Sequence, residues 1–543
     1  MASRTNPPEG AGVSRRGLLV GAGAVAVTAL GAGAVSAQAA GTAADFGPVT
    51  VRPGDLRYEN LLRGNNFRFV NSPDEIRVVA STEQVVRAVG EAVRAGKRVA
   101  VRSGGHCFEN LTADPAVRVL LDLSPMDEVT YDPARRAFSV QPGATLGQVY
   151  RRLLTGWGVT IPGGGCPEVG AGGHFAGGGY GPLSRRYGSV VDHLYAVEVV
   201  VVDKDGTARA VVATREPDDP NRDLWWAHTG GGGGNFGVVT RFWLRSPGAT
   251  GTDPAKLLPA SPQQMRQHVL IWPWAAMTER QLTGLLRNFG RWHERNSAPG
   301  RPQNGLYGVL QAGHKASGSV LLAVQADADL PGVDAMMTEL ITAVTAGLDL
   351  PTPLVDLRRS LPWLHRMTWP GSGEPGDVIV RRYKIKAGYL RRSFTESQLA
   401  TIHRHLINDS GGPHAGMLLI SYGGQANAVA PGATAIAQRD VIMKAVYQTI
   451  WRDDTEDKAN LKWVREFYRD VYIETGGVPV PGPVNDGSYI NYADADLADP
   501  VWNTSGVSAQ TLYYKDNYPR LRRIKAKWDP RNVFRHSLSV EAG

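Results

Sequence analysis

The sequence has very little cysteine. Only Cys107 and Cys166 occur among 543 residues, which is too few for a fold that depends on a framework of disulfides. The two thiols either form a single bridge or leave at least one thiol for chemistry. The sequence also lacks a Walker loop, an H-E-x-x-H pair and a nucleophile elbow. It therefore has none of the motifs typical of P-loop nucleotide hydrolases, zincin metalloproteases or α/β-hydrolases.

Long apolar runs and concentrated charge are missing as well. No segment beyond the N-terminus has the length and apolarity of a membrane span, so we expect no membrane partner. The formal net charge is +8, but the charges are scattered and form no basic stripe with interleaved aromatics. We therefore expect no nucleic-acid partner. His403 and His405 stand two apart on a predicted helix and face apart, so we expect no metal site there or elsewhere.

The N-terminal residues 1–41 have the features of an export signal. Arg15-Arg16 precedes an apolar run of Gly, Ala, Val and Leu, and Ala37-Gln38-Ala39 supplies small residues for cleavage. This resembles a twin-arginine signal, whose export machinery carries folded proteins, and an ordinary secretory signal is the alternative. Either reading predicts a secreted protein.

The mature sequence predicts two α+β units and a C-terminal segment. Residues 42–248 begin with β-α-β periodicity, and residues 247–262 are rich in Pro, Gly, Thr and Ala, as in a linker. Residues 263–480 alternate helical stretches with strand-like runs, and residues 481–543 return to loops and one short basic helix. The composition, 42% hydrophobic and 20% charged, is that of a globular protein.

Three glycine-rich loops lie next to predicted strands of the first unit, at Arg102–His106, Gly163–Gly181 and Gly230–Gly237. Glycine allows a positive φ and lets backbone N–H groups approach an anion with no Cβ in the way. Tight turns would explain any single loop, whereas three loops together indicate a large phosphorylated ligand. The Gly232–Gly237 segment fits G-x-G-x-x-G, but a strand follows it instead of a helix, so a nicotinamide site is not expected.

The motifs in these loops carry a family resemblance. Val101–His106 has the sequence V-R-S-G-G-H, Pro162–Cys166 has P-G-G-G-C, and Gly230–Thr240 contains the third glycine run. Near the C-terminus, Asn491-Tyr492 precedes W-D-P-R-N-V-F at Trp528–Phe534. In this order, over nearly all of the mature chain, the motifs resemble the vanillyl-alcohol-oxidase/PCMH-type flavoproteins, and among them the berberine-bridge-enzyme-like branch.

One subgroup of that branch is more similar still. The segments Gly178–Arg185, Trp225–Thr229 and Trp502–Gly506 resemble hexose oxidases that act on sugars of glycopeptide antibiotics. Many members of the branch have Arg before the third glycine run, whereas this chain has Thr229, a change that the hexose-oxidase subgroup shares.

The resemblance implies an α+β fold: a PCMH-type FAD-binding fold of two subdomains, with an α+β substrate domain built on an antiparallel sheet. It implies FAD bound bicovalently, with His106 bonded to the flavin 8α-methyl carbon and Cys166 bonded to flavin C6. A Cys107–Cys166 disulfide is the alternative for the second thiol. The other cofactor-binding positions that the resemblance implies are Arg102, Ser103, Gly104, Gly105, Gly170, Gly172, Gly173, Gly177, Gly178, Gly237, Val239, Asn491 and Asn532.

The resemblance also points to tyrosines as the acid–base groups. Hydride transfer from an alcohol requires the hydroxyl proton to leave, and a phenol or phenolate can accept it. Tyr492 matches the position of the family's base, and Tyr422, before a Gly-Gly pair, is a candidate partner. Tyr180 lies in the cysteine loop and is a third candidate. For each tyrosine, a packed aromatic with a satisfied hydroxyl is the alternative.

The sequence therefore predicts an exported FAD-linked oxidase. Its substrate would be an alcohol of a sugar, oligosaccharide or glycoside, and O2 would accept the electrons to give hydrogen peroxide. The export signal favours an extracellular sugar over an antibiotic made inside the cell. The alternatives are a flavin-dependent dehydrogenase, an oxidative cyclase on a secondary metabolite, and a non-catalytic sugar-binding protein.

Overall fold

The computed structural model describes residues 46–368 and 382–543. The predicted export signal, with Arg15 and Arg16, lies outside these residues. The sequence also predicts a strand at Ile379–Lys386, and its first residues lie outside the described ranges as well. Within the described ranges, no helix combines the length and the apolarity needed to cross a membrane.

The first unit contains two sheets that share one core. A four-stranded sheet has the order β1 (Val49–Val51), β2 (Glu75–Val78), β4 (Val119–Asp122), β3 (Val99–Arg102), with only β1 antiparallel to its neighbour. A five-stranded antiparallel sheet has the order β5 (Val129–Asp132), β6 (Ala137–Val140), β9 (Val238–Leu244), β7 (Leu194–Val202), β8 (Ala208–Thr214). The helix α2 (Thr82–Arg94) joins them, because its buried Val85 and Val89 pack in one cluster with Leu121, Val200 and Val238.

The sequence predicts a capping box from Ser81 and Gln84 and a helix end at Gly96, and α2 follows this prediction in part. Ser81 is the N-cap, and its Oγ accepts a hydrogen bond from the N–H of Gln84 at 3.3 Å. The Gln84 side chain, however, accepts the N–H of Ala80 at 2.8 Å, so the capping box is only half formed. Gly96, with a φ of +65°, follows the helix as predicted.

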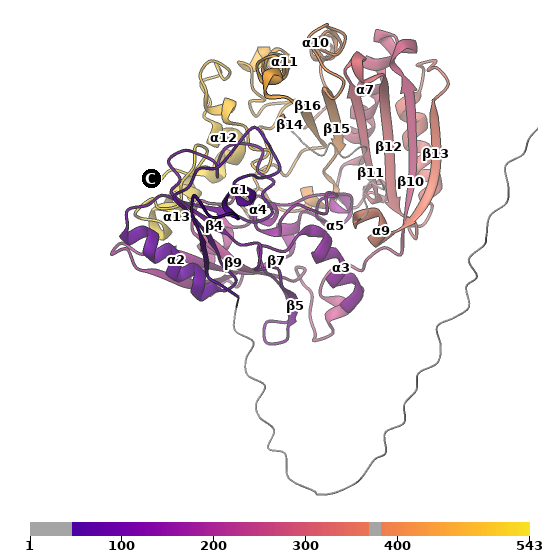
Figure 1. Cartoon of the computed structure of the whole chain (residues 1–543). Helices are drawn as coiled ribbons and strands as arrows, with labels where there is room; N and C mark the ends of the chain where they lie inside the picture. Colours follow the sequence, from indigo (N-terminus) through magenta and orange to yellow (C-terminus); the bar gives the residue numbers. More distant parts are fainter. Residues whose placement is uncertain (1–45, 369–381) are drawn as a thin grey trace, which may run out of the picture. The chain divides into compact units, whose positions relative to one another are not determined.

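The second unit is a seven-stranded antiparallel sheet with helices along it. The strand order is β13 (Val355–Pro362), β10 (Gln264–Pro273), β12 (Ser319–Asp327), β11 (Leu306–Gly313), β15 (Gly416–Ser421), β16 (Met443–Trp451), β14 (Arg382–Leu390). The helices α8 (Val333–Thr345), α7 (Glu279–Asn296), α10 (Glu396–Leu406) and α11 (Asp457–Val471) contact one another in that order and pack on the sheet (Figure 1).

The two faces of this sheet have different neighbours. Along β16, Met443 and Ala445 belong to the large core that includes the helices, whereas Val446 packs in a cluster of tyrosines. Side chains alternate along a strand, so Lys444 lies on the tyrosine face with Val446. The strand period therefore places a lysine among aromatic rings.

The C-terminal segment returns to the first unit. It contains α12 (Ala509–Tyr514) and α13 (Tyr518–Trp528). Lys525 is fully buried and donates hydrogen bonds to the carbonyls of Asn235 and Phe534 and to the Asp529 carboxylate, at 2.6–2.7 Å. Phe534 belongs to the same core as α2. These contacts fasten the segment to the third glycine loop.

Some local expectations were wrong. Residues 247–262 are not a loose linker, because Leu257 and Leu258 are buried in the main core and the Pro259 carbonyl accepts the N–H of Thr160. The sequence reasoning also assigned no structure to β5, β8, α4 (Ala171–Ala176) and α6 (Arg222–Ala227). The helix α4 was missed because its A-G-G-H-F-A sequence has poor intrinsic helix propensity, which packing overrides.

Candidate active site

The three predicted glycine loops meet in the structure. A Cβ on Gly104 would come within 2.4 Å of the backbone nitrogen of Gly170, so the first and second loops touch through bare backbone. A Cβ on Gly177 would collide with the Asn491 side chain at 2.0 Å, and the N–H of Gly232 donates to the carbonyl of Ala176 at 3.0 Å. Several of these glycines are therefore required by loop-to-loop packing, independently of any ligand.

Other glycines border space that no protein atom fills. A Cβ on Gly165 or Gly173 would meet nothing within 4 Å. Gly165 directly precedes Cys166, and both Cys166 and His106 are half-buried, so a ligand can reach them. Bare backbone beside a thiol fits a flat cofactor that lies on the main chain. No disulfide joins Cys107 to Cys166, and loss of solvent raises the pKa of the Cys107 thiol to about 11.

Two side chains that sequence reasoning missed hold the Cys166 loop. The hydroxyl of Tyr150, on α3 (Leu146–Trp157), donates to the Gly164 carbonyl at 2.6 Å, and the Gly164 N–H donates to His174 Nε2 at 3.1 Å. Burial lowers the pKa of His174 to about 4, which keeps the ring neutral and able to accept that bond. The N–H and the carbonyl of Gly164 are thus both hydrogen-bonded, two residues before Cys166.

The candidate tyrosines gather in one place. The tyrosine cluster consists of Tyr180, Tyr389, Tyr422, Tyr489 and Tyr492. The hydroxyls of Tyr180 and Tyr492 lie 2.6 Å apart and share a hydrogen bond. The Tyr422 ring meets the Tyr180 ring edge-on at 5.8 Å, and its hydroxyl lies 3.1 Å from Ser189 Oγ. The structure thus gives Tyr492 the partner Tyr180, where the sequence had favoured Tyr422.

Lys444 lies inside this cluster, and the sequence analysis did not single it out. Its Nζ is 3.2 Å from the ring centroid of Tyr180, 3.7 Å from that of Tyr489, 4.5 Å from that of Tyr422 and 4.8 Å from that of Tyr389. The side chain is 1% exposed, and Nζ has no hydrogen-bond partner among the described residues. The one available signal was a lysine within an apolar strand, M-K-A-V-Y-Q-T-I-W.

Burial perturbs the pKa values of the lysine and the tyrosines of the cluster in opposite directions. Burial lowers the pKa of Lys444 well below its usual value, and burial, with Tyr492 next to it, raises the pKa of Tyr180 well above 10. A cation over an aromatic face is attracted to the ring, and more strongly to a phenolate. A protonated Lys444 therefore acts against the rise in the Tyr180 pKa that burial causes. It stabilises the deprotonated form of the Tyr180–Tyr492 pair. Strongly perturbed groups of this kind are typical of catalytic sites.

Other predicted positions have structural partners of their own. The Arg102 guanidinium is buried, donates to the Asp122 carboxylate and also bonds the Leu61 carbonyl. Asn532 lies in an exposed turn after α13, and Val239 lies on β9. The side chains of these three predicted cofactor residues therefore contact other parts of the protein or solvent, and not all of them lie against the glycine loops.

The remaining predicted positions lie on or beside the loops. Ser103 donates to the Pro142 carbonyl at 2.5 Å, and Asn491 donates to the His174 carbonyl at 2.9 Å. Positive φ angles of +73°, +123° and +154° make glycine necessary at Gly105, Gly178 and Gly237. Gly172 packs against Pro142 and Ser103.

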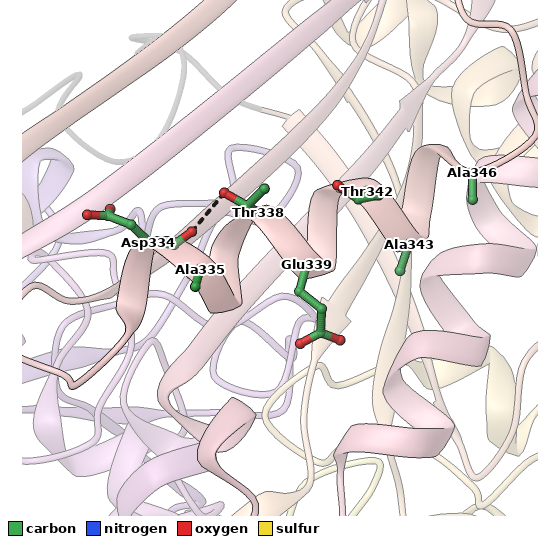
Figure 2. A pocket seen from close by; sticks show the side chains of 7 residues that line it. All are labelled: Asp334, Ala335, Thr338, Glu339, Thr342, Ala343 and Ala346. Atoms are coloured by element: carbon green, nitrogen blue, oxygen red, sulfur yellow. Dashed lines mark hydrogen bonds between the residues drawn. The ribbon is translucent and has the colours of Figure 1, made fainter.

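No other part of the described chain competes as a site. A depression of about 680 Å³ is open and lined by α8 and the residue that follows it, by Asp334, Ala335, Thr338, Glu339, Thr342, Ala343 and Ala346 (Figure 2). Its two carboxylates, on Asp334 and Glu339, pair with neighbouring side chains. Among residues 46–368 and 382–543, no group of His, Cys, Asp and Glu side chains is arranged to hold a metal ion.

The loops bring bare backbone together beside a cluster of phenols, an arrangement that fits a class of protein that holds a large flat cofactor. Comparison with known proteins names that class. A family model described as an FAD binding domain matches residues 73–211, and one described as berberine and berberine like matches residues 488–541.

The relatives agree. An aclacinomycin-N/aclacinomycin-A oxidase of Streptomyces galilaeus is 52% identical over 540 residues, covering 97% of this chain and 98% of that protein. A hexose oxidase of Chondrus crispus is 30% identical over 540 residues, covering 90% of this chain and 93% of that protein. The solved structure of a glycopeptide hexose oxidase complexed with teicoplanin matches with a TM-score of 0.87 at 50% identity, over 91% of this chain and 99% of that one.

The chain therefore belongs to the berberine-bridge-enzyme-like family of FAD-linked oxidoreductases. The predicted PCMH-type α+β fold and the predicted FAD-linked enzyme class are both confirmed.

Proposed function

We propose that this enzyme oxidises an alcohol of a sugar, oligosaccharide or glycoside, with O2 as electron acceptor. The carbon loses a hydride and its hydroxyl loses a proton, so the alcohol becomes a carbonyl while O2 becomes hydrogen peroxide. The proposal rests above all on the Tyr180–Tyr492 hydroxyl pair, 2.6 Å apart and covered by the buried Lys444. Such a pair suits the removal of a hydroxyl proton.

The proton is handled by the protein's own side chains. Tyr492 accepts the substrate hydroxyl proton, and Tyr180 shares the resulting negative charge through their hydrogen bond. Protonated Lys444 stabilises that charge from above the Tyr180 ring. When bound, FAD supplies the hydride acceptor and passes the electrons on to O2.

We infer that His106 and Cys166 would hold the cofactor covalently, through the flavin 8α-methyl carbon and C6. Each bond would replace a flavin C–H bond and a protein N–H or S–H bond, and O2 would take up the two electrons and two protons released. Support comes from the half-buried positions of both side chains, from the open space beside Gly165, and from the two hydrogen bonds that hold Gly164. Two bonds would leave the site free to stay open to a bulky glycoside, because affinity alone need not retain the cofactor.

The substrate class is supported by the hexose oxidase and the glycopeptide hexose oxidase among the relatives. A secondary metabolite is the second candidate, because the relative at 52% identity is an aclacinomycin oxidase. We propose export through a signal that contains Arg15-Arg16. Export favours a substrate outside the cell, a sugar or secreted glycoside.

The test combines a cofactor assay with a substrate panel. The purified protein is precipitated with acid, the flavin in pellet and supernatant is measured, and peptides are mapped for flavin. Peroxide release is then followed with free sugars, oligosaccharides, glycosides and aglycone alcohols, alongside Tyr492→Phe as a control. Peroxide from sugars or glycosides, lost in the control, supports the proposal. Substrate-dependent flavin reduction without peroxide in air would indicate a dehydrogenase, and a flavin-free protein would overturn the oxidase reading.

A further inference from the structure

A buried group of charges lies on the helix face of the edge strand β14. The ion cluster consists of three cations and three anions: Lys384, Lys386, Arg465, Glu109, Asp494 and Asp496. Lys386 Nζ lies over the Tyr468 ring of α11 at 4.6 Å, which shows the face that the lysines occupy. Five members have side chains no more than 6% exposed, and Arg465 is 28% exposed.

Every member is paired within the cluster. Lys384 bonds Glu109 and lies 2.7 Å from the Asp494 carboxylate, and Lys386 contacts Asp494 at 2.6 Å and Asp496 at 2.9 Å. Arg465 completes the set with two bonds to Asp496, at 3.0 and 2.8 Å. Burial alone would lower the pKa of Lys384, but Asp494, Glu109 and Asp496 outweigh it and raise that pKa.

Stability alone does not account for such a group. Buried ion pairs are often no more stabilising than apolar residues of the same size, whereas the loss of one partner is strongly destabilising. What a satisfied network can do is fix one arrangement of the segments it joins. The role of this cluster therefore follows from the segments that it joins.

It joins both functional loops to one strand. Glu109 follows His106 by three residues, and Asp494 follows Tyr492 by two. Both carboxylates bind the same ammonium group, that of Lys384. The loop of His106, the predicted attachment residue, and the loop of Tyr492, the predicted base, are thus both held by Lys384.

A second set of contacts connects the same two loops. The Phe108 ring stacks on Tyr492, with centroids 5.4 Å apart and planes at 15°, and packs edge-on against Tyr383 of β14. Asn66 donates hydrogen bonds to the carbonyls of Phe108 and Tyr383, each at 3.1 Å. A shift of the His106 loop would therefore move the Tyr492 ring.

We propose that Glu109 and Lys384 are positioning residues that set His106 and Tyr492 against each other, and that this alignment is required for the flavin bond at His106. The proposal rests on the proposed covalent attachment and extends it. In this proposal the two attachment residues are positioned independently. The ion cluster positions His106, and the hydrogen bonds to Gly164 position Cys166.

The test uses the full holoenzyme and Glu109→Gln. This variant keeps Lys384 paired with Asp494 and Asp496, so it severs one link without stripping the cluster. Peptide mapping and in-gel flavin fluorescence should show the His106 bond reduced at least fivefold and the Cys166 bond retained. Asp494→Asn loosens the Tyr492 side of the same junction, so it should also reduce the His106 bond, keep the Cys166 bond, and lower kcat about tenfold with KM little changed. Lys384→Arg should restore more of the His106 bond than Lys384→Met.

The matched control is Asp457→Asn. It breaks an ion pair with Arg382 on the same strand without touching either loop, and both bonds should persist. Glu109→Gln with both bonds intact and normal kcat would overturn the proposal, and so would equal loss of both bonds. Wild-type protein without a His106 bond would overturn the proposed tether itself, which distinguishes that failure from failure of the positioning role.

Discussion

Replacing Lys444 by Met tests the chemistry of the tyrosine cluster directly. The change keeps the length and most of the volume of the side chain and removes a 1%-exposed amino group that has no hydrogen-bond partner among the described residues and whose charged form is disfavoured by burial. Desolvating such a cation costs several kcal/mol, whereas its attraction to a ring returns about 2 kcal/mol. We therefore expect Lys444→Met to unfold at the same temperature as the wild type or at a higher one.

The same substitution should lower the activity. Nζ lies 3.2 Å from the Tyr180 ring centroid, and a charge pair about 4 Å apart is worth about 4 kcal/mol at an effective dielectric of 20. If the cation stabilises the transition state by only about 2 kcal/mol more than the ground state, its loss slows the rate about 30-fold. Loss of the full charge pair gives about 1,000-fold. We expect kcat to fall between these limits.

The assay is peroxide release against pH with the best substrate from the panel, together with thermal unfolding. Removing the cation raises the pKa of the phenol pair, so the rising limb of the pH–rate profile should move to higher pH. Lys462→Met, at an exposed position on α11, is the control and should change neither property. A kcat within threefold of wild type and an unmoved limb would refute the role assigned to Lys444.

Three further substitutions each test the role of one residue. Tyr492→Phe should lower kcat by about 10² to 10⁴ with flavin attachment intact, measured by steady-state kinetics; unchanged kcat would remove Tyr492 as the base. Tyr150→Phe leaves the Gly164 carbonyl without its donor, so mapping should find fewer flavin bonds at Cys166 than at His106; equal loss at both would contradict the local role. Burial lowers the pKa of His228 to about 4, so unfolding takes up a proton between about pH 6.5 and 4, and stability should fall as pH drops through that window. His228→Gln should flatten the pH dependence of the unfolding temperature, and an unchanged slope would show that this histidine does not contribute.

Much of the architecture was predictable because it depends on local patterns. The sequence predicts a helix at Glu279–Asn296 and a strand at Leu194–Val202, and both form with these bounds, because a strong 3.6-residue period and a run of β-branched residues each favour one structure. The glycine loops were also visible in the sequence. Their meeting was not, because the reason for Gly104 is Gly170, 66 positions later, and that contact exists only after folding.

The sequence by itself determined the family, the enzyme class, and the His106, Cys166 and Tyr492 candidates, because each stands in a short motif whose chemistry is local. The tertiary structure alone decided the partners: Tyr180 for Tyr492, Lys444 among the rings, and Glu109 with Lys384 at the junction of two loops. Glu109 and Lys384 are 275 residues apart. No local period or motif encodes such a contact, since it results from packing a loop of the first unit against the edge strand of the second.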